Sequence, residues 1–226
     1  MKKTPLILGM ENDKTLVDYY ARRAAEYEEI YLKPERQSDL RRLAECLSKA
    51  FPAFDVLEVA CGTGYWTKHI AKSARRIVAV DINAEVLEIA CRKAYGSCQV
   101  SFLQKDAYSL AEVPSDCTAG FHGFWWTHVP LQRLPGFLRC FHAHLPKGAP
   151  IITIDNAYVE GSSTPISRRD EHGNTYQTRE LRDGSQHEVL KNFPSVADIH
   201  CHLEGHASDV RVTQLTYYWM AEYRKK

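Results

Sequence analysis

A short glycine turn follows an apolar run near residue 55, and its composition suits ligand binding. Val56, Leu57 and Val59 belong to a run that is typical of a central strand in a parallel sheet. Gly62 and Gly64 follow at once, and glycines let a turn bring its backbone close to a ligand. Open α/β sheets bind ligands in the crevice outside the carboxyl ends of their strands. The pattern therefore predicts a site for a nucleotide-like ligand.

The spacing of the glycines distinguishes between two kinds of nucleotide site. A dinucleotide-binding turn carries a third glycine, as Gly-x-Gly-x-x-Gly, and the pyrophosphate then rests on a helix N-terminus. Here Tyr65, Trp66 and Thr67 follow Gly64, so the third glycine is missing. An acid, Glu58, stands four residues before the glycine pair instead, and it can accept a hydrogen bond from an ammonium group or order the loop. A nicotinamide oxidoreductase is therefore only a distant third alternative.

Three later segments also end in residues suited to a site. Arg76–Asp81 reads as a second strand that ends in an acid, and Val100–Asp106 reads as a third. Gly120–Pro130 reads as a fourth strand and its exit. The ordered set of four strand ends is far more specific than any one of them.

Together these segments resemble the class I S-adenosylmethionine-dependent methyltransferases, and in particular small bacterial members that act on small molecules. The resemblance covers roughly Leu16 to Tyr223. It implies S-adenosylmethionine as the cofactor and S-adenosylhomocysteine as the product. The chain departs mildly from the family pattern, because Ala60 stands where most members have the first glycine of the motif and Glu58 replaces the commoner aspartate.

The resemblance implies a role for each cofactor-binding residue. Asp81 matches the carboxylate that takes the ribose hydroxyls, and Ile82 matches the apolar residue that packs on adenine. Asp106 stands near the position of the adenine amino group. The expected cofactor-binding residues are Tyr20, Tyr27, Glu58, Ala60, Cys61, Gly62, Thr63, Gly64, Trp66, Asp81, Ile82, Asp106, Ala107, Gly123 and Phe124.

Aromatic residues near the start of the chain suit a sulfonium cofactor. Tyr20, Tyr27 and Tyr31 are spaced at seven and four residues along one face of an expected helix, and aromatic faces attract a cation. The segment from Tyr19 to Tyr27 is similar to an opening that closes over the cofactor in related members. The alternative is a tyrosine stripe that only packs on the sheet edge. Trp66 either closes the cofactor loop or packs under it.

Residues after the fourth strand are candidates for chemistry on the methyl acceptor. His128 is the first choice for a general base, because an imidazole of near-neutral pKa can take a proton from an attacking N–H or O–H group. Its alternative role is to order the turn before Pro130. Successive strand residues face opposite ways, so only one of Trp125 and Trp126 is expected to line the pocket. Trp126 and Tyr158 are the expected substrate-binding residues.

Several other features support weaker interpretations. His202 and His206 are spaced at four residues on an expected helix, but no zinc motif accompanies them, so no metal is predicted. Cys61 is expected to be a small packing residue. The arginines of the predicted insert either grip an acidic substrate or form a solvated face around its hairpin; they are Arg168, Arg169, Arg179 and Arg182.

Alternating helix and strand patterns predict an α/β fold. The resemblance sharpens this to a three-layer Rossmann-like sandwich, whose mostly parallel seven-stranded sheet has an antiparallel last strand. Leu16–Tyr31 is expected to be helical, Ser195 to cap a helix, and Val210–Tyr223 to form the terminal strand. We expect one domain over residues 1–226, with a helical cap at 1–50 and a hairpin insert or lid at 158–192.

Composition agrees with a small-molecule enzyme. The chain has 226 residues, 44% of them hydrophobic, and a formal net charge of +1, which gives no bulk attraction to nucleic acid or to an anionic membrane. Seven cysteines and no apolar leader favour a reducing cytoplasm. The protein is expected to be a monomer or a homodimer. The predicted function is methyl transfer to an N or O nucleophile of a small molecule. Methylation of RNA, DNA or protein is one alternative, and a non-catalytic S-adenosylmethionine sensor is another.

Overall fold

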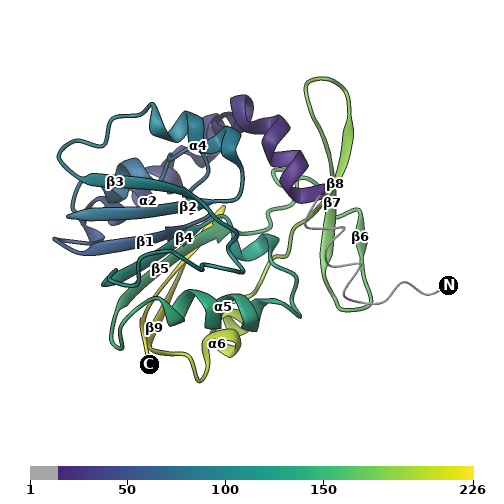
Figure 1. Ribbon diagram of the computed structural model, residues 1–226. Helices are drawn as coiled ribbons and strands as arrows, with labels where there is room; N and C mark the ends of the chain where they lie inside the picture. The colour runs from purple at the N-terminus through teal and green to yellow at the C-terminus, as the bar shows by residue number, and fades with distance from the viewer. Residues whose placement is uncertain (1–14) are drawn as a thin grey trace.

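A seven-stranded sheet forms the centre of the computed structural model, which describes residues 15–226 (Figure 1). The strand order is β3-β2-β1-β4-β5-β10-β9. The five parallel strands are β1 (Asp55–Val59), β2 (Arg76–Asp81), β3 (Gln99–Gln104), β4 (Ala119–Gly123) and β5 (Pro150–Asn156). Because these five strands are parallel, their carboxyl ends lie at one edge of the sheet. The acids at or just after the ends of β2 and β3 in the predicted site therefore lie at the same edge.

Hydrophobic burial explains why β1 lies at the centre of the sheet. Val56, Leu57 and Val59 are fully buried, because the strand pairs with β2 on one side and with β4 on the other. A strand that is covered on both faces is a continuous apolar run rather than an alternating one, which is the pattern that the sequence shows. Glu58 is the exception within this run, and it is equally buried.

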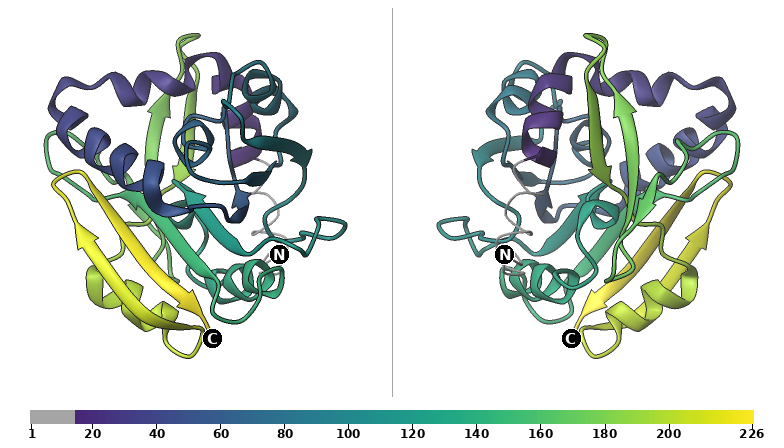
Figure 2. Two further views of the ribbon diagram at one scale, coloured as in Figure 1. Left: turned by 90° about the vertical axis from the view of Figure 1, so that its left-hand side faces the viewer. Right: turned by 90° about the vertical axis from the view of Figure 1, so that its right-hand side faces the viewer.

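Helices cover both faces of the sheet (Figures 1 and 2). On one face lie α2 (Gln37–Ala50), α4 (Ala84–Cys91) and the short α3 (Thr67–Ile70). On the other face lie α5 (Leu134–Ala143) and α6 (Val196–Leu203). Each layer has its own apolar cluster, one built on the leucines of α2 and the other on the phenylalanines of α5. The predicted three-layer Rossmann-like sandwich is confirmed.

The end of the chain differs in detail from the prediction. The single strand expected at Val210–Tyr223 is wrong, because the chain forms a hairpin of β9 (Ala207–Gln214) and β10 (Tyr218–Lys225). Strand β10 runs antiparallel between β5 and β9, as the resemblance implied for the last strand. The turn between them contains no glycine, proline or asparagine, so it lacks the residues that mark a turn in a sequence.

The N-terminal segment lies over the carboxyl edge of the sheet (Figure 1). Residues 15–23 are α-helical, and the chain continues as 3-10 helices η1 (Ala24–Leu32) and η2 (Pro34–Arg36). The predicted helix over Leu16–Tyr31 therefore changes from α to 3-10 geometry at Ala24. Residues 1–14 of the predicted cap lie outside the described residues. None of the helices within residues 15–226 has the length and hydropathy of a bilayer-crossing segment.

A second, three-stranded sheet lies between β5 and α6 in the sequence. It consists of β6 (Arg168–Arg169), β7 (Thr175–Glu180) and β8 (Gln186–Leu190), and it stands beside the N-terminal helix at the carboxyl edge of the main sheet (Figure 1). The turn between β7 and β8 contains Asp183 and Gly184, with Gly184 at φ +79°. Helix α6 begins with a capping box between Ser195 and Asp198, which fixes its start where the sequence predicts it.

Candidate functional site

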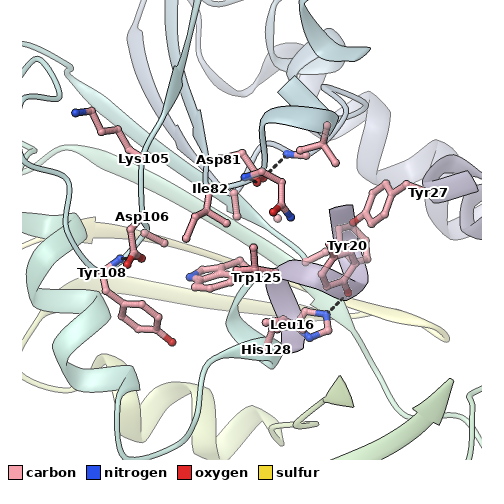
Figure 3. Close-up of a pocket in the computed structure, with 18 residues that line it drawn as sticks. Leu16, Tyr20, Tyr27, Asp81, Ile82, Lys105, Asp106, Tyr108, Trp125 and His128 are labelled. Carbon is pink, nitrogen blue, oxygen red and sulfur yellow. Dashed lines mark hydrogen bonds between the residues drawn. The ribbon is translucent and has the colours of Figure 1, made fainter. Parts of the chain in front are cut away.

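A cavity opens at the carboxyl ends of β1, β2, β3 and β4, and we call it the strand-end cavity (Figure 3). Eleven of the predicted site residues line it: Tyr20, Tyr27, Ala60, Gly62, Asp81, Ile82, Asp106, Ala107, Gly123, Phe124 and His128. The residues that the prediction missed are Leu16, Val17, Asn83, Val86, Lys105, Tyr108 and Trp125. Leu16 precedes Tyr20 by one helical turn, so the helical period was the signal that could have identified it.

Asp81 organises the turn after β1. Its Oδ2 accepts a hydrogen bond from the backbone N–H of Gly62 at 2.9 Å, and its Oδ1 accepts one from the N–H of Asn83 at 3.0 Å. Burial raises the pKa of the Asp81 carboxyl, and these backbone bonds oppose the rise. Each oxygen keeps acceptor capacity toward the cavity, so Asp81 can take a pair of neighbouring hydroxyl groups.

The glycine turn does not present free amides to a pyrophosphate in the way a dinucleotide site does. Gly62 has φ +55° and gives its N–H to Asp81. Gly64 has φ +76°, and a Cβ there would lie 2.3 Å from the Tyr95 hydroxyl. Gly64 is therefore required by the packing of the turn against Tyr95, and it does not line the strand-end cavity. The arrangement disfavours the NAD alternative.

Two residues other than glycine have left-handed backbone at the cavity. Ala60 has φ +57° and Phe124 has φ +58°, at the exits of β1 and β4. Such a conformation costs about 1 kcal/mol for a residue with a Cβ. The value at Ala60 gives the physical reason why glycine is the usual residue there in the resembling family. Strain of this kind is typical of functional sites.

Glu58 lies beneath the cavity rather than on it. The side chain is 1% exposed, and its Oε2 has no hydrogen-bond partner among the described residues. Burial, with a smaller contribution from the nearby charge of Asp81, raises the pKa of Glu58 to about 8. The carboxyl is therefore mostly neutral at pH 7, and its predicted contact with an ammonium group remains a prediction.

Ile82 and Asp106 lie toward the other end of the cavity from Tyr20 (Figure 3). Ile82 is 39% exposed and lines the strand-end cavity, which leaves its surface available to a flat apolar ligand. Asp106 accepts a hydrogen bond from the N–H of Tyr108 at 2.9 Å, and its carboxylate remains open to solvent. Both positions suit the adenine contacts that the resemblance implies.

His128 and Tyr20 form a hydrogen-bonded pair at the opposite end (Figure 3). His128 Nδ1 lies 2.7 Å from the Leu190 carbonyl, which can only accept, so Nδ1 carries the proton. Nε2 then accepts from the Tyr20 hydroxyl at 2.8 Å. Burial, together with the charges of Lys191 and Arg179, holds the pKa of His128 well below its ordinary value. The imidazole is neutral at pH 7, and its lone pair is already used.

Three predicted cofactor residues pack around the glycine turn without lining the cavity. Cys61 is 7% exposed, and burial raises the pKa of its thiol, as fits a packing residue. Thr63 donates a hydrogen bond to Glu28 of η1 at 2.6 Å, which ties the turn to the N-terminal segment. Trp66 is buried and stacks on Phe124.

The predicted substrate residues Trp126 and Tyr158 lie together in a different cavity. Trp125, not Trp126, lines the strand-end cavity. Strand alternation does not decide between them, because β4 ends at Gly123 and the chain turns at Phe124 before the 3-10 helix η3 (Trp126–His128) begins. The buried Trp126 packs against Trp219 in the core.

A second cavity of about 430 Å³ adjoins the first, and we call it the polar cavity. Its walls come from residues 19–36, 156–164 and 177–193, together with Phe124, His128 and Tyr218. Four residues line both cavities: Tyr20, Tyr27, Phe124 and His128. The two cavities therefore meet at this wall of aromatic side chains.

Lys191 is a site residue that sequence reasoning missed. Its Nζ donates to Asp155 Oδ1 at 3.0 Å and lies 3.3 Å from His128 Nε2. Both charged side chains are buried, and burial lowers the pKa of Lys191 to about 8 although Asp155 opposes this. No local pattern marks a lysine at the end of a hairpin as buried, so only the packing of the insert identifies it. In the described part of the chain, no cluster of three potential ligands could hold a metal ion.

Comparisons with known proteins agree with this geometry. Residues 56–148 match a family described as a methyltransferase domain. The solved structure titled "DhpI-SAM-HEP complex" is 27% identical, with a TM-score of 0.76, and the match covers 94% of this chain and 97% of that chain. The "DhpI-SAH complex structure" is 28% identical, with a TM-score of 0.72 over 94% and 96% of the two chains.

Two further matches are more distant. The N-methyltransferase NodS from Bradyrhizobium japonicum WM9, solved with S-adenosyl-l-homocysteine, has a TM-score of 0.63 over 93% of this chain and 98% of that chain. Its identity is 13%, so it shares the fold alone. A curated relative, the tabtoxin biosynthesis enzyme of Pseudomonas amygdali pv. tabaci, is 24% identical over 97 residues. That match covers 43% of this chain and spans only 38% of the relative's length.

Proposed function

The chain belongs to the class I S-adenosylmethionine-dependent methyltransferases, and we propose that it methylates an oxygen or nitrogen nucleophile of a small molecule held in the polar cavity. One observation carries this proposal. The strand-end cavity and the polar cavity share a wall formed by Tyr20, Tyr27, Phe124 and His128. A methyl donor in the strand-end cavity and an acceptor in the polar cavity would therefore approach each other at these four shared residues.

The residues of the strand-end cavity fit S-adenosylmethionine. Asp81 offers two carboxylate oxygens to the ribose hydroxyls, and the exposed face of Ile82 suits adenine. Tyr20 and Tyr27 place aromatic rings at the end nearest the acceptor, where their faces attract a sulfonium. When bound, the cofactor supplies an electrophilic methyl group on a positively charged sulfur. The protein has to align the acceptor and exclude water.

The size of the polar cavity supports a small acceptor. A volume of about 430 Å³ lies within the usual range for small-molecule sites, roughly 300–1,000 Å³. Its walls include the insert and the N-terminal segment, so the acceptor lies between these elements and the main sheet. A nucleic acid or protein acceptor would have to place its reactive group through the same enclosure.

His128 was predicted to be the general base, and its geometry supports a positioning role instead. Its Nε2 holds the hydroxyl of Tyr20 at 2.8 Å, and its Nδ1 is fixed by the Leu190 carbonyl. We propose that His128 orients the Tyr20 ring at the wall between the cavities. Burial keeps the pKa of the imidazole low, which makes it a weak proton acceptor.

Calorimetric titration tests the cofactor, and labelled methyl transfer tests the activity. We expect the protein to bind S-adenosylmethionine and S-adenosylhomocysteine, and NAD to give no heat beyond dilution. A panel of small metabolites with methyl-labelled S-adenosylmethionine should then yield a labelled product. Binding of NAD without S-adenosylmethionine would refute the proposal, whereas cofactor binding without transfer on a broad panel would favour the sensor alternative.

A further inference from the structure

Positively charged side chains from three parts of the chain converge on the polar cavity. Arg23 comes from the N-terminal helix, Lys33 and Arg36 lie in or beside η2, and Arg179 and Lys191 come from the insert. Arg36 and Lys191 are buried. Such a gathering of cations costs free energy through mutual repulsion and desolvation unless something offsets it.

The acids in the same lining do not offset this charge. Glu26 and Glu29 both pair with Arg182, which does not line the polar cavity. Glu180, the remaining acid of the lining, is exposed on β7. Lys191 has a buried partner in Asp155 at 3.0 Å, and Arg36 lies 4.0 Å from Glu35. Among the described residues the excess charge therefore rests mainly on Arg23 and Arg179.

Arg179 is the cation whose position is best defined. Its Nε and Nη2 donate to Gln177 Oε1 at 3.2 and 2.7 Å, and Gln177 Nε2 in turn donates to the Thr164 carbonyl at 2.5 Å. Within residues 15–226 it forms no ion pair with a carboxylate, and the polar groups that act on its charge are the hydroxyls of Tyr19 and Tyr20. The guanidinium is thus held in place by a buried amide and by two tyrosine hydroxyls, which are uncharged, rather than by a carboxylate.

Arg179 and Lys191 also lie close to the wall between the two cavities. Lys191 Nζ is 3.3 Å from His128 Nε2, and the charges of both cations add to the effect of burial in lowering the pKa of His128. Tyr20, which lines both cavities, is among the groups nearest to Arg179. An anion bound to Arg179 would therefore lie beside the place where the methyl group is transferred.

We infer that the methyl acceptor is a small oxyanion, a phosphate, phosphonate or carboxylate, which Arg179 binds and whose oxygen receives the methyl group. This inference rests on the proposed function. A lone pair on the anionic oxygen forms the new oxygen–carbon bond while the carbon–sulfur bond breaks and its electron pair stays on sulfur. The charges of the oxyanion and the sulfonium cancel, and the products are an ester and a neutral thioether.

This chemistry agrees with the groups at the wall. An oxyanion is already deprotonated at neutral pH, so its methylation releases no proton and requires no general base. The residues that line both cavities offer only hydroxyls, a phenyl ring and an imidazole whose lone pair is already used. An amine or a phenol would have to lose a proton during the reaction, and no carboxylate lines this wall.

Binding of small anions tests the inference with the protein saturated with S-adenosylhomocysteine. The probes are methylphosphonate, inorganic phosphate and acetate, with ethylamine as the probe that lacks an anion. Arg179→Met removes the charge and keeps the length of the side chain. Arg168→Met is the matched control, because Arg168 belongs to the same insert, pairs with Glu188 and does not line the polar cavity.

We expect at least one of the anions to bind and ethylamine not to bind. Arg179→Met should weaken anion binding by about 10- to 100-fold, since a charged hydrogen bond contributes roughly 1.5–3 kcal/mol. Arg168→Met should leave it unchanged, and both variants should keep the affinity for S-adenosylhomocysteine. The anion that binds more tightly distinguishes a phosphorus oxyanion from a carboxylate.

Two outcomes would overturn the inference. The first is anion affinity that is absent or equal in the Arg179 and Arg168 variants while the cofactor still binds, which would leave the proposed function intact. The second is labelled methyl transfer to amines that lack an anion and none to oxyanions. Failure to bind S-adenosylmethionine would instead refute the proposed function, whatever the anions do.

Discussion

The wall between the two cavities consists of side chains that hold one another in place. Tyr20 packs edge-to-face on Tyr27, with ring centroids 5.8 Å apart, and donates to His128. Tyr27 in turn packs on Tyr31, and burial raises the pKa of all three tyrosines. The hydroxyls therefore stay protonated at physiological pH and act as hydrogen-bond donors or ring surfaces. None of them is a ready proton acceptor.

The pair of Tyr20 and His128 allows a test of positioning against general-base catalysis. If His128 acts through Tyr20, His128→Asn and Tyr20→Phe should each lower kcat by a similar factor, and the double variant should be little worse than either. The kcat of the parent protein should stay level between pH 6 and 8. Steady-state kinetics on an acceptor from the screen measures this. A much larger loss in the histidine variant, with kcat rising with pH, would restore the general-base role.

Asp81 allows a second test at the residue scale. Asp81→Asn keeps the size of the side chain and one acceptor oxygen, but it removes the charged acceptor for the ribose hydroxyls. We expect the binding of S-adenosylmethionine to weaken by about 1.5–3 kcal/mol, measured by calorimetry. Glu85→Gln on the exposed face of α4 is the control, and thermal unfolding should show both variants folded. Unchanged affinity in the Asp81 variant would contradict its assignment to the ribose.

At the scale of elements, a buried ion pair joins the insert to the main sheet. Asp155 is the penultimate residue of β5, and its carboxylate accepts from the backbone N–H and the hydroxyl of Thr127 in η3 at 3.0 and 2.7 Å. Lys191 follows β8 and supplies the countercharge at 3.0 Å. The insert is thus fixed against the sheet next to His128. The second sheet, predicted only as a hairpin insert or lid, carries residues that complete the polar cavity.

Replacing one member of this ion pair should lower the free energy of unfolding more than replacing both. Lys191→Met leaves the buried Asp155 without its countercharge, and we expect the free energy of unfolding to fall by about 3–5 kcal/mol. The double variant Lys191→Met with Asp155→Asn should recover a large part of that loss. Urea unfolding of the parent and the two variants measures the difference. A loss below about 1 kcal/mol in Lys191→Met would show that the pair does not stabilise the fold.

At the scale of the whole molecule, the fold stores several neutral histidines in its interior. Burial lowers the pKa of His122 to about 3 and that of His142 to about 4, and it places the pKa of His128 well below its ordinary value. His142 is fixed by the hydroxyl of Tyr223 at 3.0 Å. In the unfolded chain all three regain a pKa of about 6.5.

These histidines predict how stability depends on pH. Between their folded pKa values and about 6.5, the unfolded chain binds more protons than the folded one, so their contribution is present above pH 6.5 and is lost as pH falls. In that range each histidine lowers the free energy of unfolding by about 1.4 kcal/mol for every pH unit that the pH falls. Glu58 has the opposite effect, because its pKa is raised to about 8 and the folded state keeps its proton. Between about pH 4.3 and 8 it therefore offsets the pH dependence of roughly one histidine. Urea unfolding at pH 7.0, 6.0 and 5.0 should show a steady decline.

A histidine variant isolates this effect from general acid sensitivity. His142→Gln should flatten the decline by about 1.4 kcal/mol per pH unit, because it removes one of the protons that the unfolded chain takes up. His172→Gln, which replaces an exposed histidine, is the matched control variant. Equal slopes in the parent and in the His142 variant would mean that His142 titrates normally in the folded protein.

The sequence by itself determined the layers of the fold and the cavity that we propose for the cofactor. Strand patterns that end in a glycine turn or an acid are local, and the parallel connections bring Gly62, Asp81 and Asp106 to the same edge of the sheet. The strain at Ala60 is part of the same local motif. These features are therefore readable from neighbouring residues, and the structure places those three residues on one cavity.

Only the tertiary structure decided what lies across from the strand-end cavity. Tyr20 meets His128 across 108 positions of the chain, and Lys191 meets Asp155 across 36. Trp125, rather than Trp126, lines the strand-end cavity because the backbone at Phe124 is left-handed. The residue type at that position does not predict this conformation. The cations of the polar cavity are individually ordinary surface residues in the sequence. They form a cluster of like charges around the polar cavity only because the insert and the N-terminal segment pack over the edge of the sheet.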